Sequence, residues 1–190
     1  MKTVLRRIYR EKRMQLSDSE RDKMTDLLLI NFQKLDLPFI KCVHTYLASA
    51  ELNEIDTYII TRFLSFTNPD LKIVVPKIIT DQGKMIHYVF NENTELVLNQ
   101  FGIPEPSGGE EVPTSDIELV LTPLLLFDER GYRIGYGKGY YDKFFATCGK
   151  NVIKIGLSFF DPVPVINDVN RFDIPLNYCI TPEKVYDFKK

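Results

Sequence analysis

A strand, a glycine-rich loop and a helix in succession constrain the fold more than any other part of the chain. A largely apolar run, residues 119–127, is followed by three alternating glycines, Gly135, Gly137 and Gly139. A continuous apolar run is typical of a parallel strand buried on both faces, and the residues after the glycines read as a helix. Ligands bind at the carboxyl ends of strands in open α/β sheets. The stretch therefore predicts a central strand, Ile117–Pro123, that leads to a ligand-binding loop.

The glycine-rich loop has the composition of a phosphate-binding site. Glycine takes positive φ angles that cost other residues about 1–2 kcal/mol each, and without a Cβ atom it lets main-chain N–H groups converge on an anion. Arg133 and Lys138 add positive charge beside the glycines. The spacing G-x-G-x-G differs from the G-x-G-x-x-G of dinucleotide-binding folds, and the chain has no G-x-x-x-x-G-K-[ST]. A glycine-rich surface turn is the alternative, but the neighbouring arginine, lysine, paired tyrosines and aspartate favour a phosphate loop.

Length and composition are those of an ordinary globular domain. With 190 residues, 44% of them hydrophobic and 26% charged, the chain can bury a core without disulfides or metals. We expect a single domain over residues 1–190. The three cysteines form no C-x-x-C and the two histidines no H-E-x-x-H, which excludes the common zinc motifs. The charged N-terminus and the proline in the longest apolar run argue against a signal peptide or a membrane span, so we expect a cytoplasmic protein.

Helical and strand patterns alternate along the chain, which is typical of α/β folds. A basic helix is expected over Lys2–Met14, and a second helix runs from the capping box Ser17–Glu20 to about Phe32. We predict one three-layer α/β/α domain with a mostly parallel sheet and helices on both faces. His44 lies inside the first expected strand, where we expect a hydrogen-bonded core residue and not a catalytic one. The expected strands are Cys42–Leu47, Leu71–Pro76, Lys84–Phe90, Ile117–Pro123 and Val152–Ser158.

Positive charge is concentrated in two segments, residues 1–13 and 130–141, although the formal net charge is −2. Basic residues of the first helix recur at spacings of four, four and three, which places them on one face. These residues are Lys2, Arg6, Arg10 and Arg13. Two basic segments on an acidic body predict a focused anion site. A solvated basic helix and an RNA-binding module are the alternatives, and the second is disfavoured because aromatic residues are not interleaved with the basic ones.

The glycine loop and its flanks resemble a known family signature. The pattern is Phe127-Asp128-x-x-Gly131-x-Arg133-Ile134-Gly135-x-Gly137-Lys138-Gly139-Tyr140-Tyr141-Asp142. It resembles the signature of the 5-formyltetrahydrofolate cyclo-ligases, also called methenyltetrahydrofolate synthetases. Four further segments are similar to motifs of that family, so the resemblance covers almost the whole chain. They are Lys2–Arg6, Glu54–Thr57, Phe101–Pro106 and Asp173–Pro182.

The resemblance implies an ATP-dependent cyclisation of 5-formyltetrahydrofolate to 5,10-methenyltetrahydrofolate. ADP and phosphate are released, and the reaction passes through a phosphorylated formyl intermediate. ATP is then a co-substrate and Mg²⁺ a cofactor. The implied partner is 5-formyltetrahydrofolate, with or without a polyglutamate tail. We expect a monomer that binds neither nucleic acid nor a membrane.

The resemblance also implies roles for individual residues. The residues expected to act on the transferred phosphoryl group are Lys138 and Arg133. The expected ATP-binding residues are Lys2, Arg6, Arg133, Ile134, Gly135, Tyr136, Gly137, Lys138, Gly139, Tyr140 and Tyr141. The expected folate-binding residues are Ser49, Glu54, Phe101 and Tyr140. The expected Mg²⁺ ligands are Asp142 and Asn177.

The second metal position departs from the family pattern, because Asn177 stands where the family has an aspartate. An amide oxygen carries no formal charge, and Mg²⁺ prefers carboxylates. We therefore expect weaker metal binding without loss of activity. The alternative is a nucleotide- or folate-binding paralogue of the same fold that lacks cyclo-ligase activity.

Overall fold

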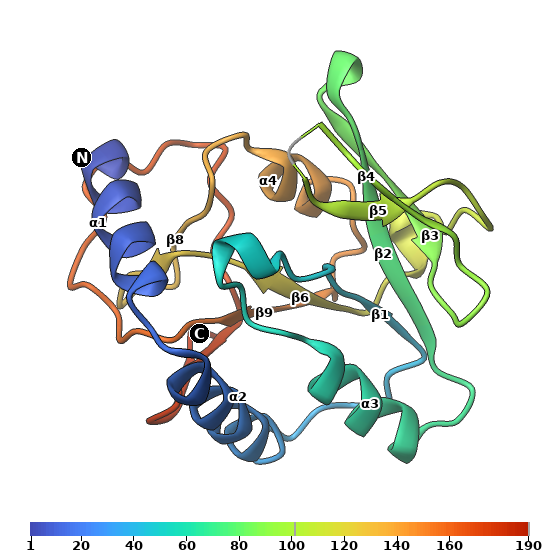
Figure 1. Cartoon of the computed structure of the whole chain (residues 1–190), viewed down its shortest axis with the longest axis horizontal. Coiled ribbons are helices and arrows are strands. Elements are labelled where there is room, and N and C mark those ends of the chain that lie inside the picture. The colour runs from blue at the N-terminus through green and yellow to red at the C-terminus, as the bar shows by residue number, and fades with distance from the viewer. Residues whose placement is uncertain (101, 190) are drawn as a thin grey trace.

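The structure is a computed structural model that describes residues 1–100 and 102–189. These residues form a seven-stranded sheet in which the central strands run parallel and one antiparallel strand closes each edge (Figure 1). In order across the sheet the strands are β11 (Val185–Asp187), β10 (Tyr178–Ile180), β9 (Ile153–Leu157), β6 (Leu119–Pro123), β1 (Cys42–His44), β2 (Lys72–Ile79) and β3 (Lys84–Val89).

Helices and two small sheets surround the large sheet. The helices are α1 (Lys2–Met14), α2 (Asp18–Phe32), α3 (Tyr58–Thr67) and α4 (Tyr140–Phe145), with short 3-10 turns η1 (Ala50–Leu52), η2 (Thr80–Gln82) and η3 (Thr114–Asp116). The two-stranded sheets pair β4 (Leu96–Leu98) with β5 (Pro104–Pro106), and β7 (Leu126–Phe127) with β8 (Arg133–Ile134). In the described part of the chain, no helix has the length and apolar character needed to cross a membrane.

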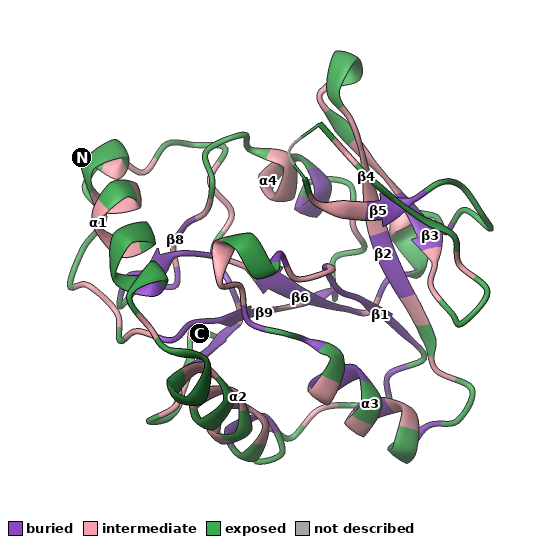
Figure 2. Cartoon of the chain, viewed as in Figure 1, coloured by how far each residue is buried: buried purple, intermediate pink, exposed green. Residues whose placement is uncertain are grey.

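Strand β6 shows how both faces of the sheet are covered. Leu119 and Leu121 belong to a core cluster with Leu28 of α2 and residues of α3, whereas Val120 between them packs in a second cluster with Phe144 of α4. Successive side chains of a strand point to opposite faces, so α2 and α3 cover one face and α4 the other (Figure 1). The central strands are buried, and the outward sides of α2 and α3 are exposed (Figure 2). The predicted α/β fold, with a mostly parallel sheet and helices on both faces, is confirmed.

The first two helices begin and end where the sequence predicts. Helix α1 covers Lys2–Met14, and α2 opens with the predicted capping box. The Ser17 hydroxyl accepts from the Glu20 backbone N–H at 3.3 Å, and the Glu20 carboxylate accepts from the Ser17 N–H at 2.8 Å. Two otherwise unpaired helix-end donors are thereby satisfied.

The apolar run of residues 119–127 is not one strand. It leaves the large sheet after Pro123 and turns into the β7–β8 hairpin, where Leu125 N–H donates to the Ile134 carbonyl at 2.8 Å. The hairpin satisfies backbone groups that the sheet no longer pairs. The expected strand from Cys42 ends at His44, earlier than predicted. The glycine loop therefore begins at the end of a hairpin and not at the end of the central strand.

Two buried histidines meet between the sheet and α4. His44 is fully buried as predicted, but the prediction that it is hydrogen-bonded is wrong, because neither ring nitrogen has a partner among the described residues. Its ring centroid lies 5.0 Å from that of His87, which stacks on Phe144 at 4.2 Å. Burial lowers the pKa of His87 to about 4 and that of His44 well below its usual value. Both rings are therefore neutral at pH 7.

Candidate functional site

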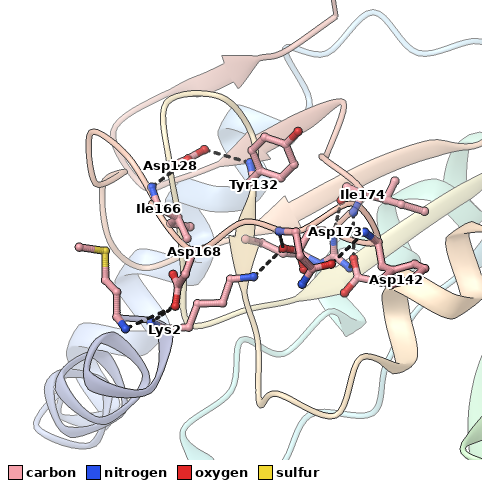
Figure 3. A network of polar contacts seen from close by, with 12 residues as sticks. Lys2, Asp128, Tyr132, Asp142, Ile166, Asp168, Asp173 and Ile174 are labelled. Carbon is pink, nitrogen blue, oxygen red and sulfur yellow. Dashed lines mark hydrogen bonds and ion pairs between the residues drawn. The ribbon is translucent and has the colours of Figure 1, made fainter.

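Asp128 fixes the base of the glycine loop. Its side chain is fully buried, and Oδ1 accepts from the backbone N–H groups of Arg130 and Tyr132, both at 3.0 Å. Oδ2 accepts from the Ile166 N–H at 3.0 Å (Figure 3) and from the Arg130 guanidinium at 2.8 Å. One carboxylate thus ties the hairpin that carries the loop to the segment around residue 166. The hydrogen bonds of Asp128 therefore hold the start of the loop in place.

The glycines of the loop admit a guanidinium group from α1. Gly137 and Gly139 have φ angles of 92° and 72°, where other residues are strained, whereas Gly135 does not have a positive φ. A Cβ atom on Gly137 would lie 2.9 Å from Cζ of Arg6, which is closer than such atoms come. Arg6 Nε also donates to the Gly135 carbonyl oxygen at 3.0 Å. The loop and the first helix therefore meet at atoms that only glycine leaves accessible.

Three further residues in and beside the loop differ in solvent exposure. Lys138 is exposed, and Tyr140 is half-buried at the start of α4. The Ile134 side chain is buried at 1% exposure, so only its backbone is available to a ligand. Helix α4 follows Gly139 and has only six residues, so its dipole contributes little to anion binding.

Three of the four basic residues on the common face of α1 contact the rest of the protein, whereas Arg10 is exposed. Besides Arg6, Lys2 forms an ion pair between Nζ and Asp173 Oδ2 at 2.6 Å (Figure 3). Arg13 is only 4% exposed, and its Nη2 donates to the hydroxyl of Tyr136 at 2.6 Å. These contacts contradict the alternative of a solvated basic helix, because three of its cations bind the loop or a segment beside it.

A buried ion pair lies at the start of α4. Arg133 Nη2 donates to Asp142 Oδ1 at 2.9 Å, and Nη1 donates to the Ile174 carbonyl at 2.6 Å. The Ile174 N–H in turn donates to Asp142 Oδ1 at 3.1 Å (Figure 3). The guanidinium also lies over the ring of Phe145, with Cζ 4.8 Å from the centroid. Burial lowers the pKa of Arg133, and the Asp142 carboxylate opposes that shift.

Glu54 is positioned by bonds to both carboxylate oxygens. Oε1 accepts from the hydroxyl of Tyr136, and Oε2 accepts from the backbone N–H of Ser49 at 2.8 Å. The Glu54 N–H donates back to the Ser49 carbonyl at 3.1 Å. The structure therefore brings Glu54 and Ser49 to the glycine loop, although more than 80 positions separate Glu54 from Tyr136 in the chain.

Three tyrosine hydroxyls lie near the Glu54 carboxylate. Burial raises the pKa of Tyr46, Tyr136 and Tyr141, and the charge of Glu54 raises each of them further. The hydroxyl of Tyr141 is buried without a hydrogen-bond partner among the described residues. An uncompensated buried hydroxyl costs about 1–3 kcal/mol, which favours a polar partner at this position. The surroundings of Glu54 thus combine one carboxylate with aromatic rings and an available hydroxyl.

The two expected Mg²⁺ ligands are already bonded within the protein. Asp142 uses Oδ1 for Arg133, and Asn177 Oδ1 accepts from the Lys154 N–H at 2.8 Å in the pairing of β9 with β10. Within residues 1–100 and 102–189, no group of three His, Cys, Asp or Glu side chains could hold a metal ion. The donor set that fits Mg²⁺ is thus one carboxylate, Asp142. Such a set suffices where phosphates and water supply the other ligands.

Most of the predicted residues lie in one region, but some that shape it were missed. Phe101 lies outside the described residues. The sequence predicted no individual site role for Arg13, Asp128 or Asp173, each of which acts by holding another residue. The pattern of basic spacings on α1 signalled Arg13, but nothing local to Asp173 indicated that it meets Lys2 across the fold.

The chain is similar to known proteins over most of its length. The sequence model of the 5-formyltetrahydrofolate cyclo-ligase family matches residues 1–182. A Schizosaccharomyces pombe protein named probable 5-formyltetrahydrofolate cyclo-ligase is 29% identical over 127 residues, which are 60% of this chain and 62% of that protein. The 5-formyltetrahydrofolate cyclo-ligase of Escherichia coli strain K12 is 30% identical over 109 residues, 56% of this chain and 60% of that protein. The alignments thus span less than two thirds of the length of these curated relatives.

The fold is also similar to a solved structure. The NMR structure of Aquifex aeolicus 5,10-methenyltetrahydrofolate synthetase superposes with a TM-score of 0.80 at 27% sequence identity. The superposition covers 100% of this chain and 93% of that one.

Proposed function

The chain belongs to the 5-formyltetrahydrofolate cyclo-ligase family, and we propose that it catalyses the reaction for which the family is named. In this reaction ATP and Mg²⁺ drive the cyclisation of 5-formyltetrahydrofolate to 5,10-methenyltetrahydrofolate, with release of ADP and phosphate. The names of the relatives from yeast and Escherichia coli support the proposal. The cytoplasmic location, the single domain and the monomeric state stay predictions.

The contact between Arg6 and the glycine loop carries the proposal. Arg6 lies against Gly137 and donates to the Gly135 carbonyl, so a cation is fixed beside the backbone of the glycine loop. Main-chain N–H groups together with arginine and lysine are the usual ligands of phosphate. The triphosphate of ATP would lie along Gly135–Gly139, with Arg6, Lys2 and Lys138 around it. Asp173 would orient Lys2 toward the nucleotide.

The chemistry needs two anionic substrates held in line. The formyl oxygen takes the γ-phosphoryl group of ATP and ADP leaves. The neighbouring folate nitrogen then bonds to the formyl carbon and loses its proton, and phosphate departs with the formyl oxygen. Negative charge spreads over the transferred group, so fixed cations stabilise the transition state. Lys138 and Arg133 are the residues proposed for that role.

The folate would bind beside Glu54. A carboxylate accepts two N–H bonds from an aminopyrimidinone edge, and the bonds from Tyr136 and Ser49 already orient Glu54 for this task. Tyr140 offers a half-buried ring for the substrate. Phe101 stays a prediction, since it lies outside the described residues.

Asp142 would hold Mg²⁺ together with the phosphates and water. The ion, when bound, neutralises charge on the β- and γ-phosphate oxygens. Asp142 would hold the metal through its carboxylate, and the Arg133 guanidinium bonded to Asp142 would supply positive charge beside it. Asn177 stays a predicted ligand, and its bond to the Lys154 N–H leaves a second lone pair on Oδ1.

The methenyl product has its own absorbance, so one assay tests the proposal. We expect the chromophore to appear from 5-formyltetrahydrofolate only when ATP is present. Arg6→Ala should slow its appearance at least about tenfold, because one phosphate contact is lost. Arg7→Ala is the matched control, since the Arg7 side chain is 69% exposed and, among the described residues, pairs only with Glu11. If the folded protein binds both ligands and yields no chromophore, the result would favour the alternative of an inactive paralogue. The asparagine at position 177 supports that alternative.

A further inference from the structure

Tyr136 is the loop residue whose side chain reaches the folate side of the site. Its hydroxyl lies between Arg13 of α1 and Glu54, while its backbone lies between Gly135 and Gly137. We propose that Tyr136 couples the binding of the two substrates, so that nucleotide in the loop and folate at Glu54 each strengthen the binding of the other. This inference rests on the proposed function.

The direction of the hydrogen bonds follows from the chemistry of the three groups. Arg13 can only donate, and an ionised Glu54 can only accept. The Tyr136 hydroxyl therefore accepts from Arg13 Nη2 at 2.6 Å and gives its single hydrogen to Glu54 Oε1. Arg13 also lies over the tyrosine ring, with Cζ 5.7 Å from the centroid. The hydroxyl is thus fixed from one side and points its hydrogen toward the carboxylate.

On the nucleotide side, the backbone on either side of Tyr136 contacts Arg6. The guanidinium donates to the Gly135 carbonyl at 3.0 Å and packs against Gly137. An anion that binds Arg6 and the loop N–H groups therefore fixes the backbone from which the Tyr136 side chain extends. A bound triphosphate would hold the tyrosine where its hydroxyl meets Glu54.

On the folate side, the Tyr136 hydroxyl makes one of the two hydrogen bonds that orient the Glu54 carboxylate. Oε1 is bonded by Tyr136 and Oε2 by the Ser49 N–H at 2.8 Å, and each oxygen keeps a lone pair for a ligand N–H. Without the bond from Tyr136, the carboxylate can rotate away from the position that suits two parallel N–H donors. A bound folate would in turn hold the tyrosine and the loop in place.

Because coupling between two binding sites is reciprocal, calorimetry measures it in both directions. The probes are a non-hydrolysable ATP analogue with Mg²⁺ and 5-formyltetrahydrofolate, each titrated into the full-length protein alone and with the other at saturation. We expect each ligand to tighten the other by about fivefold or more in the wild type. In Tyr136→Phe, which removes only the hydroxyl, we expect a factor below about two.

Tyr132→Phe is the matched control, because the Tyr132 hydroxyl makes no hydrogen bond to a described residue while its ring faces Arg130 at 5.1 Å. This variant should keep the wild-type coupling. Independent binding in the wild type, or full coupling in Tyr136→Phe, would overturn the inference and leave the proposed function standing. If the wild type binds neither ligand, the proposed function itself fails, and the coupling with it.

Discussion

Arg133 and Asp142 form an ion pair of 2.9 Å in which the arginine side chain is 6% exposed and the aspartate 25% exposed. The pair joins strand β8 to helix α4 across the glycine loop, and its two members are the residues proposed for phosphoryl transfer and for Mg²⁺. The two side chains thus neutralise each other, and theirs are the charges that a metal–nucleotide complex would meet.

Loss of the carboxylate from this pair should lower stability as well as activity. Asp142→Asn leaves a buried guanidinium without its counter-charge, which we expect to reduce the free energy of unfolding by about 2 kcal/mol and the melting temperature by about 4–8 °C. Urea and thermal unfolding measure both. Glu110→Gln is the control, because its pair with Lys72 is exposed at 66% and 45%, and it should change stability by less than about 0.5 kcal/mol. Equal effects in the two variants would show that the Arg133–Asp142 pair is no more important than a surface pair.

Lys138 should matter for turnover. The side chain is exposed on the loop, and its charge is proposed to act on the transferred phosphoryl group. Lys138→Ala should reduce kcat about 100-fold, as loss of one transition-state partner typically does. Lys150→Ala, at another exposed lysine, serves as the control in the same chromophore assay. Near-normal turnover of Lys138→Ala would remove Lys138 from the mechanism.

The asparagine at position 177 should set the Mg²⁺ requirement. Asn177→Asp keeps an oxygen that can accept from the Lys154 N–H and adds a negative charge at the second predicted metal position. The Mg²⁺ concentration for half-maximal rate should fall several-fold, since Mg²⁺ prefers carboxylate ligands. The rate is followed across a Mg²⁺ titration at saturating ATP. An unchanged requirement would show that position 177 is remote from the ion.

Because of the buried histidine pair, the free energy of unfolding should depend on pH even above the pH range in which carboxylates titrate. An unfolded chain protonates histidine near pH 6.5, whereas His87 in the folded protein resists protonation down to about pH 4. As pH falls from 7.5 to 5, the unfolded state gains protons that the folded state excludes, so each histidine lowers stability by about 2 kcal/mol. Urea unfolding at the two pH values should show a smaller pH effect in His87→Leu than in the wild type. An equal pH effect in both proteins would mean that His87 is protonated in the folded state.

Local sequence patterns predicted the elements that are determined by neighbouring residues. The capping box at Ser17 and the apolar strand around Val120 depend on neighbouring residues, and both lie where predicted. The β7–β8 hairpin was missed because strands of two residues have no periodicity to detect, and because β7 lies within the apolar run that was expected to belong to the central strand.

The contacts within the candidate site were harder to predict, because they join segments far apart in the chain. The basic spacing on α1 predicted a common face, yet Arg10 is exposed while Arg13 is buried against Tyr136. Which member of such a face is buried depends on where the glycine loop lies. The Lys2–Asp173 pair spans 171 positions, and no local pattern specifies it.

The central claim is that Gly135–Gly139 and Arg6 bind the triphosphate of a nucleotide. A crystal structure of the protein with a non-hydrolysable ATP analogue and Mg²⁺ tests it most directly. The account predicts phosphate oxygens about 3 Å from the loop N–H groups and from the Arg6 guanidinium, with the metal beside Asp142. A triphosphate bound at any other part of the molecule, with the contact between Arg6 and Gly137 unchanged, would contradict the account.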